Sequence, residues 1–217
     1  MTRKPQTRRG GEEHSAVTRI VEALKKDLIN GSLRPDTLIV ETQIGKRFGV
    51  SKTPAREALV RLSGMGFVSA IPGKGYTVTK LSWQQIKDLF EVRLLLESSA
   101  IEMAAARATQ EDVGALKTAA LLPRKSSLSI EGLLDANMQF HSTIWRASRN
   151  ERLAQLASQT MDDLMRAMHT AMMSEDTGGM VEQHLHMTDL IARRKTNEAR
   201  EAMVEHVDAT RRRLLGL

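Results

Sequence analysis

Residues 48–59 read Phe48-Gly49-Val50-Ser51-Lys52-Thr53-Pro54-Ala55-Arg56-Glu57-Ala58-Leu59. A short helix is expected to end at Gly49, because glycine readily adopts the left-handed conformation that closes a helix. The following turn offers Ser51 or Thr53 as the cap of a new helix and places Pro54 in its first turn. Two helices joined by so short a turn predict a helix-turn-helix, with Arg56 near the start of the second helix.

The flanking residues extend this motif into a small domain at residues 14–80. A first helix is predicted from about His14 to Asn30, and the short helix that Gly49 ends is predicted near residues 42–48. After the third helix, a turn at Pro72-Gly73-Lys74-Gly75 joins two strands expected at 67–71 and 76–79. This pattern predicts a winged helix-turn-helix, in which the hairpin forms the wing. Residues 1–13 read as a basic flexible arm.

The charge distribution indicates which half of the chain meets a polyanion. The 217 residues carry a net charge of +6. Residues 1–80 hold 15 basic and 7 acidic side chains, whereas the remaining residues hold 17 and 19. The basic excess therefore lies in the half with the helix-turn-helix pattern, which favours DNA as its partner.

Several side chains in this half suit contacts with a DNA groove. The start of a helix carries partial positive charge and free N–H groups, which bind phosphate. Arg56 lies one turn further on, where a guanidinium can bind the edge of a guanine. The predicted DNA contacts are Ser51, Lys52, Thr53, Arg56, Lys74 and Gly75. The alternative interpretation is a small helical domain whose hairpin contacts another protein.

The second region, residues 81–217, is predicted to be all-α. Ser82 and Gln85 have the spacing of a capping box, which marks its first helix. Apolar periodicity predicts helices near 83–107, 111–121, 128–149, 151–173, 180–194 and 197–215. The overall expectation is a mainly α protein, with a winged helix-turn-helix followed by a helical bundle.

Three of these predicted helices each place a histidine on the apolar face. His141 shares its face with Asn137 one turn earlier, while His184 and His206 lie on the inner faces of the last two helices. Buried imidazoles need polar partners, and a divalent metal such as Zn, Ni, Mn or Fe would satisfy all three. A hydrogen-bonded polar pocket would satisfy them as well, so both interpretations stay open.

Arg93 is a second polar residue on a predicted inner face, that of the helix at 83–107. Glu97 lies four residues further on, so the two side chains could form an ion pair. Alternatively, Arg93 could bind the carboxylate of a small organic acid through its planar guanidinium.

Other compositional features limit the function. The chain has no cysteine, which excludes disulfides and thiolate sites, and its apolar runs are shorter than the roughly 20 residues that span a bilayer. We therefore expect a cytoplasmic protein that is not anchored in a membrane. No His-Glu-x-x-His motif occurs and no clear general base lies beside the histidines, so we do not expect an enzyme.

The N-terminal motif is carried by a specific set of positions. These are Gly31-x-Leu33-x-Pro35, Leu38, Glu41, Phe48-Gly49-Val50-Ser51, Thr53-Pro54, Arg56-Glu57-Ala58-Leu59, Leu62, Gly66 and Gly73-x-Gly75. Together they resemble the N-terminal domain of GntR-family transcriptional regulators over most of residues 15–79. Three positions depart from the family pattern. Asp36 replaces a usual glycine, Thr42 replaces an arginine that contacts DNA in some members, and Lys52 replaces a common arginine.

The helical region carries a second set of matching positions. These are Val92-Arg93-x-x-x-x-Glu97, Asn137-x-x-Phe140-His141, Asn150, His184 and Ala199-x-x-Ala202-Met203-x-x-His206. They resemble the FCD effector domain of the FadR subfamily of GntR regulators, in its shorter VanR-type group of six helices. The resemblance implies a divalent metal bound by Asn137, His141, His184 and His206, which helps to hold an organic acid. Aspartate is common where Asn137 stands, and a neutral amide is a weaker ligand.

These observations predict a metabolite-responsive transcriptional regulator, and the family resemblance favours a repressor. We expect a homodimer that binds a palindromic operator, since two-fold protein symmetry matches an inverted repeat. Two alternatives are a metal-dependent enzyme acting on a small organic acid and an architectural protein that binds DNA without sequence preference.

Overall fold

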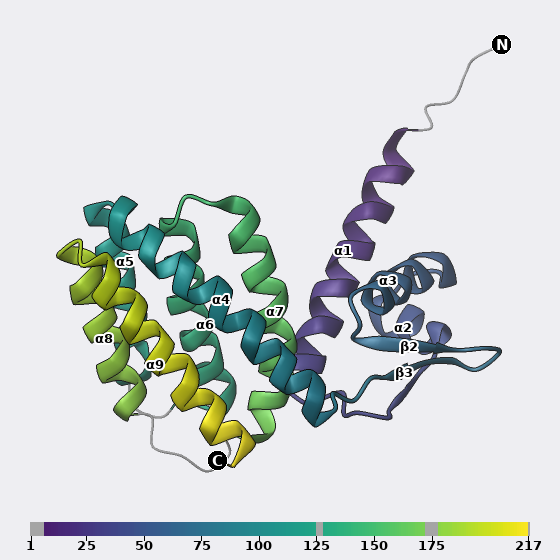
Figure 1. The fold of residues 1–217 in the computed structure, drawn as a ribbon. Helices are drawn as coiled ribbons and strands as arrows, with labels where there is room; N and C mark the ends of the chain where they lie inside the picture. The colour runs from purple at the N-terminus through teal and green to yellow at the C-terminus, as the bar shows by residue number, and fades with distance from the viewer. Residues whose placement is uncertain (1–6, 125–127, 172–177, 217) are drawn as a thin grey trace. The chain divides into compact units, whose positions relative to one another are not determined.

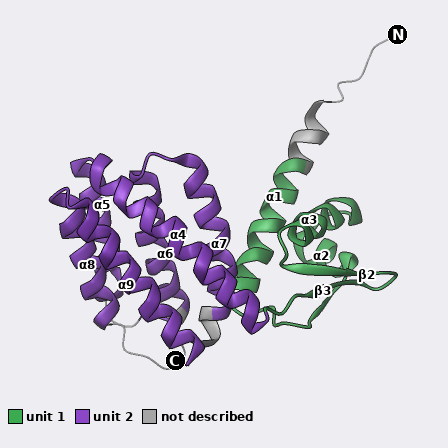
Figure 2. Cartoon of the chain, in the orientation of Figure 1, with its two compact units in different colours: residues 1–81 green, residues 82–217 purple. Residues whose placement is uncertain are grey.

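The chain forms two compact units, Met1–Leu81 and Ser82–Leu217 (Figure 2). The computed structural model describes residues 7–124, 128–171 and 178–216. Both units are built mainly from helices, and the first also contains a small sheet (Figure 1). The predicted fold class, a winged helix-turn-helix followed by a helical bundle, is confirmed. None of the helices among the described residues is long and apolar enough to cross a bilayer.

The first unit contains the predicted helices and hairpin. Its elements are α1 (Thr7–Ile29), β1 (Leu38–Ile39), α2 (Glu41–Phe48), α3 (Lys52–Gly64), β2 (Val68–Ile71) and β3 (Gly75–Val78). The first helix begins at Thr7 rather than near His14, so it takes in part of the predicted arm. This polar extension has no apolar periodicity and was missed for that reason. Residues 1–6 of the predicted arm lie outside the described residues.

A third strand joins the predicted hairpin. The sheet has the order β1-β3-β2, and all neighbouring strands are antiparallel. In β1, Leu38 pairs with Thr77 and Ile39 pairs with Tyr76. Two residues are too short to show strand alternation, so the sequence pattern did not reveal β1. Through these pairs, β3 of the wing is hydrogen-bonded to the residues just before α2.

The turn between α2 and α3 leaves no room for a side chain at Gly45. Gly49 closes α2 in the left-handed conformation (φ 66°), as predicted, and the N–H of Val50 donates to the carbonyl of Gly45 at 2.9 Å. A Cβ added at Gly45 would lie 2.9 Å from the carbonyl oxygen of Val50. The first unit has one apolar core, to which α1, α3 and the sheet contribute. Its buried side chains include Ile20, Leu24, Leu59, Leu62, Phe67 and Val78.

Replacing Gly75 by alanine is expected to destabilise the first unit by about 1–3 kcal/mol, the usual cost of a strained backbone position. Gly75 has a φ of 127°, which side chains rarely adopt, and an added Cβ would lie 2.5 Å from the carbonyl oxygen of Ile39. The wing would have to separate from β1. Urea unfolding followed by circular dichroism measures the change.

The matched control for this substitution is Gly64→Ala. Gly64 ends α3, lies in the same unit and has no atom within 4 Å of an added Cβ. Alanine there is expected to be neutral or slightly stabilising, because it favours helix more than glycine does. An equal loss of stability in both variants would contradict the role assigned to the close approach at Gly75.

The second unit is a bundle whose described residues form the six predicted α-helices. They are α4 (Trp83–Arg107), α5 (Gln110–Leu121), α6 (Ile130–Ala147), α7 (Glu151–Ala171), α8 (Gly178–Ala192) and α9 (Thr196–Leu215), with a 3₁₀ turn η1 (Leu122–Arg124) after α5. Ser82 and Gln85 form the predicted capping box at the start of α4. Helix α4 packs against α6, α7, α8 and α9, so it is the central element of the bundle (Figure 1).

Candidate functional site

The start of α3 presents groups that suit a phosphate. Ser51 is the N-cap residue in an extended conformation, and its hydroxyl makes no capping hydrogen bond. Ser51, Lys52 and Thr53 are all exposed. The first N–H groups of a helix have no partner within the helix and attract anions. The structure thus brings three of the predicted DNA contacts together at one helix end.

Arg56 lies one turn further along α3 and is paired with Glu41 of α2. Its Nε donates to Glu41 Oε1 at 2.7 Å and its Nη2 donates to Oε2 at 3.2 Å. Lys52 Nζ lies 3.2 Å from the same Oε2. The hydrogen bond from Arg56 is the main cause that lowers the pKa of Glu41. Sequence reasoning missed this cluster, because Glu41 and Arg56 belong to different helices.

The wing begins beside the same cluster. Lys74 is exposed in the turn between β2 and β3, and Gly75 opens β3. The close approach of Gly75 to Ile39 and Val40 places the turn end of the wing next to Val40, the residue that precedes Glu41. The structure therefore gathers the start of α3, the start of α2 and the turn end of the wing on one part of the first unit.

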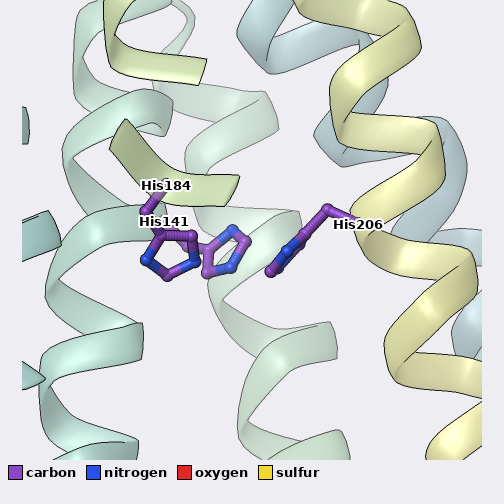
Figure 3. Close-up of side chains that lie close together, drawn as sticks. All are labelled: His141, His184 and His206. Atoms are coloured by element: carbon purple, nitrogen blue, oxygen red, sulfur yellow. The ribbon is translucent and has the colours of Figure 1, made fainter. Parts of the chain in front are cut away.

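In the second unit, three buried histidines converge from three helices. His141 comes from α6, His184 from α8 and His206 from α9 (Figure 3). Each offers a ring nitrogen, and these nitrogens all lie within 4.8 Å of one another. The side chains are 0%, 1% and 4% exposed, so the cluster is part of the core rather than the surface. The remaining predicted metal ligand, Asn137, is 3% exposed, and its Nδ2 has no hydrogen-bond partner among the described residues.

Neighbouring residues determine which nitrogens a metal could use. His141 Nδ1 lies 3.0 Å from Glu97 Oε1, and His206 Nδ1 lies 2.8 Å from Gln183 Oε1. An Nδ1–H that faces an oxygen leaves Nε2 as the metal-binding atom. His184 Nε2 is buried without a hydrogen-bond partner among the described residues. Nε2 is therefore the candidate ligand atom of His184 and His206. His141 Nδ1 makes no hydrogen bond to any described residue, so either ring nitrogen of His141 is a candidate.

The electrostatic environment keeps two of the imidazoles neutral. Burial lowers the pKa of His184 well below its ordinary value, and the charge of Arg93 lowers it further. Burial is also the largest cause that lowers the pKa of His206. Neutral imidazole is the form that binds a metal ion, so the cluster fits a divalent cation with nitrogen ligands.

Arg93 lies beside this cluster and is 2% exposed. Its Nη2 is 3.3 Å from His141 Nε2, whereas its Nε is 3.8 Å from Glu97 Oε1. Nε and Nη1 have no hydrogen bond to any described residue. The predicted pair with Glu97 is thus loose, and a buried cation retains donors that a ligand could use.

Glu97 is held on its other side by Trp145, whose Nε1 donates to Oε2 at 3.1 Å. Burial raises the pKa of Glu97, but the contacts with His141, Arg93 and Trp145 outweigh it and leave the pKa below its ordinary value. The carboxylate is therefore ionised and orients His141. Asp135, six residues before His141 on the same helix, is exposed.

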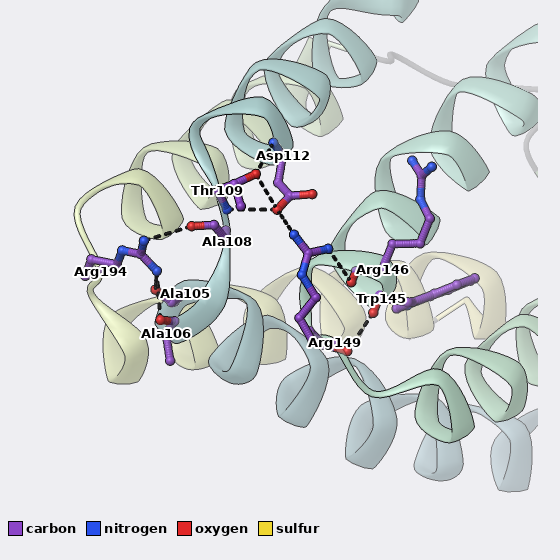
Figure 4. A network of polar contacts seen from close by, with 10 residues as sticks. Ala105, Ala106, Ala108, Thr109, Asp112, Trp145, Arg146, Arg149 and Arg194 are labelled. Atoms are coloured by element: carbon purple, nitrogen blue, oxygen red, sulfur yellow. Dashed lines mark hydrogen bonds and ion pairs between the residues drawn. The ribbon is translucent and has the colours of Figure 1, made fainter.

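Two arginines tie together the helices that carry the site. Arg149 and Arg194 follow α6 and α8 in the left-handed conformation, with φ values of 55° and 61°. Arg194 donates to the carbonyl oxygens of Ala106 at 2.7 Å and Ala108 at 2.8 Å, at the end of α4 (Figure 4). Arg149 donates to Asp112 Oδ2 at 2.6 Å, at the start of α5 (Figure 4). The Arg194 bonds satisfy free carbonyls at the end of α4 and fix α8 against it, whereas the bond from Arg149 to the Asp112 carboxylate fixes α6 against α5.

Both units match known protein families. Residues 16–78 match the family described as "Bacterial regulatory proteins, gntR family", and residues 88–209 match the FCD domain. The Nta operon transcriptional regulator of Aminobacter aminovorans is 32% identical, over 80% of this chain and 82% of its own length. The Uxu operon regulator of Haemophilus influenzae is 30% identical, over 92% of this chain and 82% of its own length.

Further relatives agree in sequence and in fold. The Escherichia coli protein GlaR, named a transcriptional repressor, is 28% identical over 85% of this chain and 89% of its own length. Among solved structures, Escherichia coli McbR/YncC superposes with a TM-score of 0.82 at 20% identity, covering 93% of this chain and 97% of that chain. A putative GntR regulator from Rhodococcus has a TM-score of 0.78 at 20% identity, covering 93% and 98%. These two structures show the same fold.

Proposed function

Because the chain belongs to the GntR family of bacterial transcriptional regulators and carries an FCD domain, we propose that it is a repressor whose operator affinity responds to a small carboxylate. The carboxylate would bind beside a divalent metal in the second unit. The observation that carries this proposal is Arg93, a buried arginine that lies next to three converging histidines and has two nitrogens without a hydrogen bond to any described residue.

The charges at the site favour an anionic ligand. His141, His184 and His206, with Asn137 as a fourth donor, would hold a metal such as Zn, Ni, Mn or Fe. Such an ion adds two positive charges to a buried site where Arg93 and Glu97 already balance each other. An uncompensated buried charge is costly, so an anion with oxygen ligands would complete the site.

Arg93 would link the metal and the effector. In the structure its Nη2 contacts His141 Nε2, one of the two ring nitrogens that could bind the metal. Metal binding at that nitrogen leaves Arg93 with a further donor to satisfy. The planar guanidinium can then form two parallel hydrogen bonds to a carboxylate. A small organic acid is thus the effector class that suits both groups.

The first unit would read DNA through the predicted contacts. The exposed start of α3, with Ser51, Lys52 and Thr53, suits a phosphate, while Arg56 can reach a guanine edge in the major groove. Lys74 and Gly75 would place the wing against the adjacent backbone or minor groove. In a homodimer, two such units would bind the halves of a palindromic operator.

Helix α4 offers a direct route between the two functions. It begins at Trp83, immediately after the first unit ends at Leu81, and it carries Arg93 further along its length. A ligand that binds Arg93 therefore acts on the helix that follows the end of the first unit in the chain. For regulation, the effector must prefer one of two arrangements of the units, because equal binding to both would shift nothing.

The proposal is tested by measuring operator affinity with and without candidate acids. A duplex enriched by the protein from a randomised DNA library serves as the operator, and fluorescence anisotropy reports binding. Lactate, succinate and citrate are the first acids to screen, by their effect on thermal unfolding of the metal-loaded protein. A bound acid that leaves operator affinity unchanged at saturation would contradict effector control.

Replacing Arg93 by methionine is expected to remove the response to the acid while the metal is retained. The thermal shift produced by the acid should fall to near zero, since a charge-assisted pair contributes roughly 1.5–3 kcal/mol. Arg200, an exposed arginine on α9, provides the control as Arg200→Met. An unchanged thermal shift in Arg93→Met would show that the acid binds elsewhere.

A further inference from the structure

The side chain of Glu41 lies among the predicted DNA contacts of α3, here called the reading surface (Ser51, Lys52, Thr53 and Arg56), where its negative charge opposes the binding of phosphates. Glu41 is the first residue of α2, and its side chain is 14% exposed between Lys52 and Arg56 of α3. An acid in the first turn of a helix is favourable by itself. That effect does not require the two hydrogen bonds that Glu41 accepts from Arg56 on another helix, so these bonds need a second explanation.

The geometry of the pair restricts how Arg56 can meet a base. The carboxylate of Glu41 occupies Nε and one hydrogen of Nη2, which form the side edge of the guanidinium. The end edge, formed by Nη1 and the other hydrogen of Nη2, stays outside this pair. A bidentate contact with guanine O6 and N7 needs two adjacent donors of this kind. Arg56 is therefore held with one binding edge filled and the other available.

We propose that Glu41 is a specificity-determining residue of the reading surface, which orients Arg56 for a base edge and restrains Arg56 and Lys52 from general phosphate contacts. This inference rests on the proposed reading of DNA by Arg56. It deepens that function by assigning a role to a residue that touches no base itself.

Two physical effects follow from this arrangement. An arginine that is already ordered loses less conformational entropy when it binds its base. Binding to unrelated DNA depends on the number of cations that release counterions from phosphates, and a cation that is paired with a carboxylate contributes less to it. Glu41 should thus raise operator affinity relative to affinity for unrelated DNA.

The test compares the full-length wild type with Glu41→Gln, which removes the charge and keeps the shape. Binding is measured to the duplex enriched from a randomised library and to a shuffled duplex of the same composition, across a salt series. We expect the ratio of the two affinities to fall about tenfold, within the range of one lost base contact. The salt slope for the shuffled duplex should steepen by roughly one or two, as paired cations become available to phosphates.

Glu57→Gln is the matched control. Glu57 neighbours Arg56 on the same helix, is exposed and lies outside the Glu41 cluster, so its substitution makes the same change in net charge. Its affinity ratio should stay within about twofold of the wild type, as for a surface charge without a positioning role. An equal effect of Glu57→Gln and Glu41→Gln on the ratio would overturn the inference, since charge alone would explain both.

A double-mutant cycle separates orientation from net charge. In an Arg56→Ala background, Glu41→Gln should change the affinity ratio by less than about twofold, because the oriented group is gone. If Glu41→Gln impairs folding, Glu41→Asp is the alternative variant. It keeps the charge but is too short to hold both cations, so it should lower the ratio and steepen the salt slope by no more than about one. An undiminished ratio in the single variants Glu41→Gln and Glu41→Asp overturns this inference alone. A library that yields no enriched duplex overturns the proposed function as well.

Discussion

Replacing His184 by alanine is expected to reduce the divalent metal content of the purified protein from about one ion per chain to near zero. The loss of a residue that only orients a ligand already lowers metal affinity by about 10- to 100-fold, and the loss of a ligand itself should exceed this. His184 is 1% exposed, and its Nε2 lacks any described hydrogen-bond partner, so no protein group competes with a metal there. Metal analysis of untagged protein purified without chelator measures the effect.

The control for this experiment is His186→Ala. His186 lies on the same helix two positions further on, and it is exposed. Its substitution should leave the metal content unchanged, which excludes an unspecific effect of removing a histidine from α8. Both variants need thermal unfolding curves, since a misfolded bundle would lose metal for a different reason.

Two outcomes would contradict the metal site. Equal metal content in wild type and His184→Ala would place any bound ion elsewhere. A wild type that takes up no metal after dialysis against Zn, Ni and Mn would show that the histidines form a polar pocket. In that case Arg93 would remain the group to follow in the search for a ligand.

Replacing Arg56 by lysine is expected to weaken operator binding by about 1–3 kcal/mol and to relax the preference at one base position. Lysine keeps the positive charge but cannot form the two parallel hydrogen bonds of a guanidinium. Affinity for a shuffled duplex should change by no more than about threefold, because phosphate binding depends mainly on charge. Anisotropy titrations with the enriched duplex and its single-base variants measure both effects.

Lys74→Ala provides the contrasting variant on the wing. Lys74 is exposed at the tip of the hairpin, where a phosphate contact is the expected role. Its loss should weaken all duplexes alike and reduce the salt slope by roughly one. If Arg56→Lys instead weakened all duplexes equally, Arg56 would be a phosphate contact, and base reading would have to come from another residue.

Local patterns in the sequence were sufficient to predict most of the helices and the wing. Gly49 ends α2 in the left-handed conformation, and Ser82 with Gln85 forms a capping box at the start of α4. These signals work because they depend on backbone conformation and hydrogen bonds within a few residues. The inward histidines were found for a similar reason, since helical periodicity places residues on a face before any partner is known.

Contacts between distant segments could not be predicted in this way. Strand β1 exists only because it pairs with β3, and Glu41 gains its partners only when α2 packs on α3. Likewise, Gln183 meets His206 across two helices, and Glu97 lies closer to His141 and Trp145 than to Arg93, with which a pair was one possibility. No periodic pattern encodes such pairs.

The amino-acid sequence by itself determined the two-part organisation, the helix-turn-helix, the basic excess of the first unit and the identity of the polar residues in the bundle. The tertiary structure decided which of those polar residues meet: three histidine nitrogens within 4.8 Å of one another, with Arg93 beside them. The physical reason is that periodicity fixes the face of a helix on which a side chain lies, whereas packing of the helices fixes its depth and its neighbours.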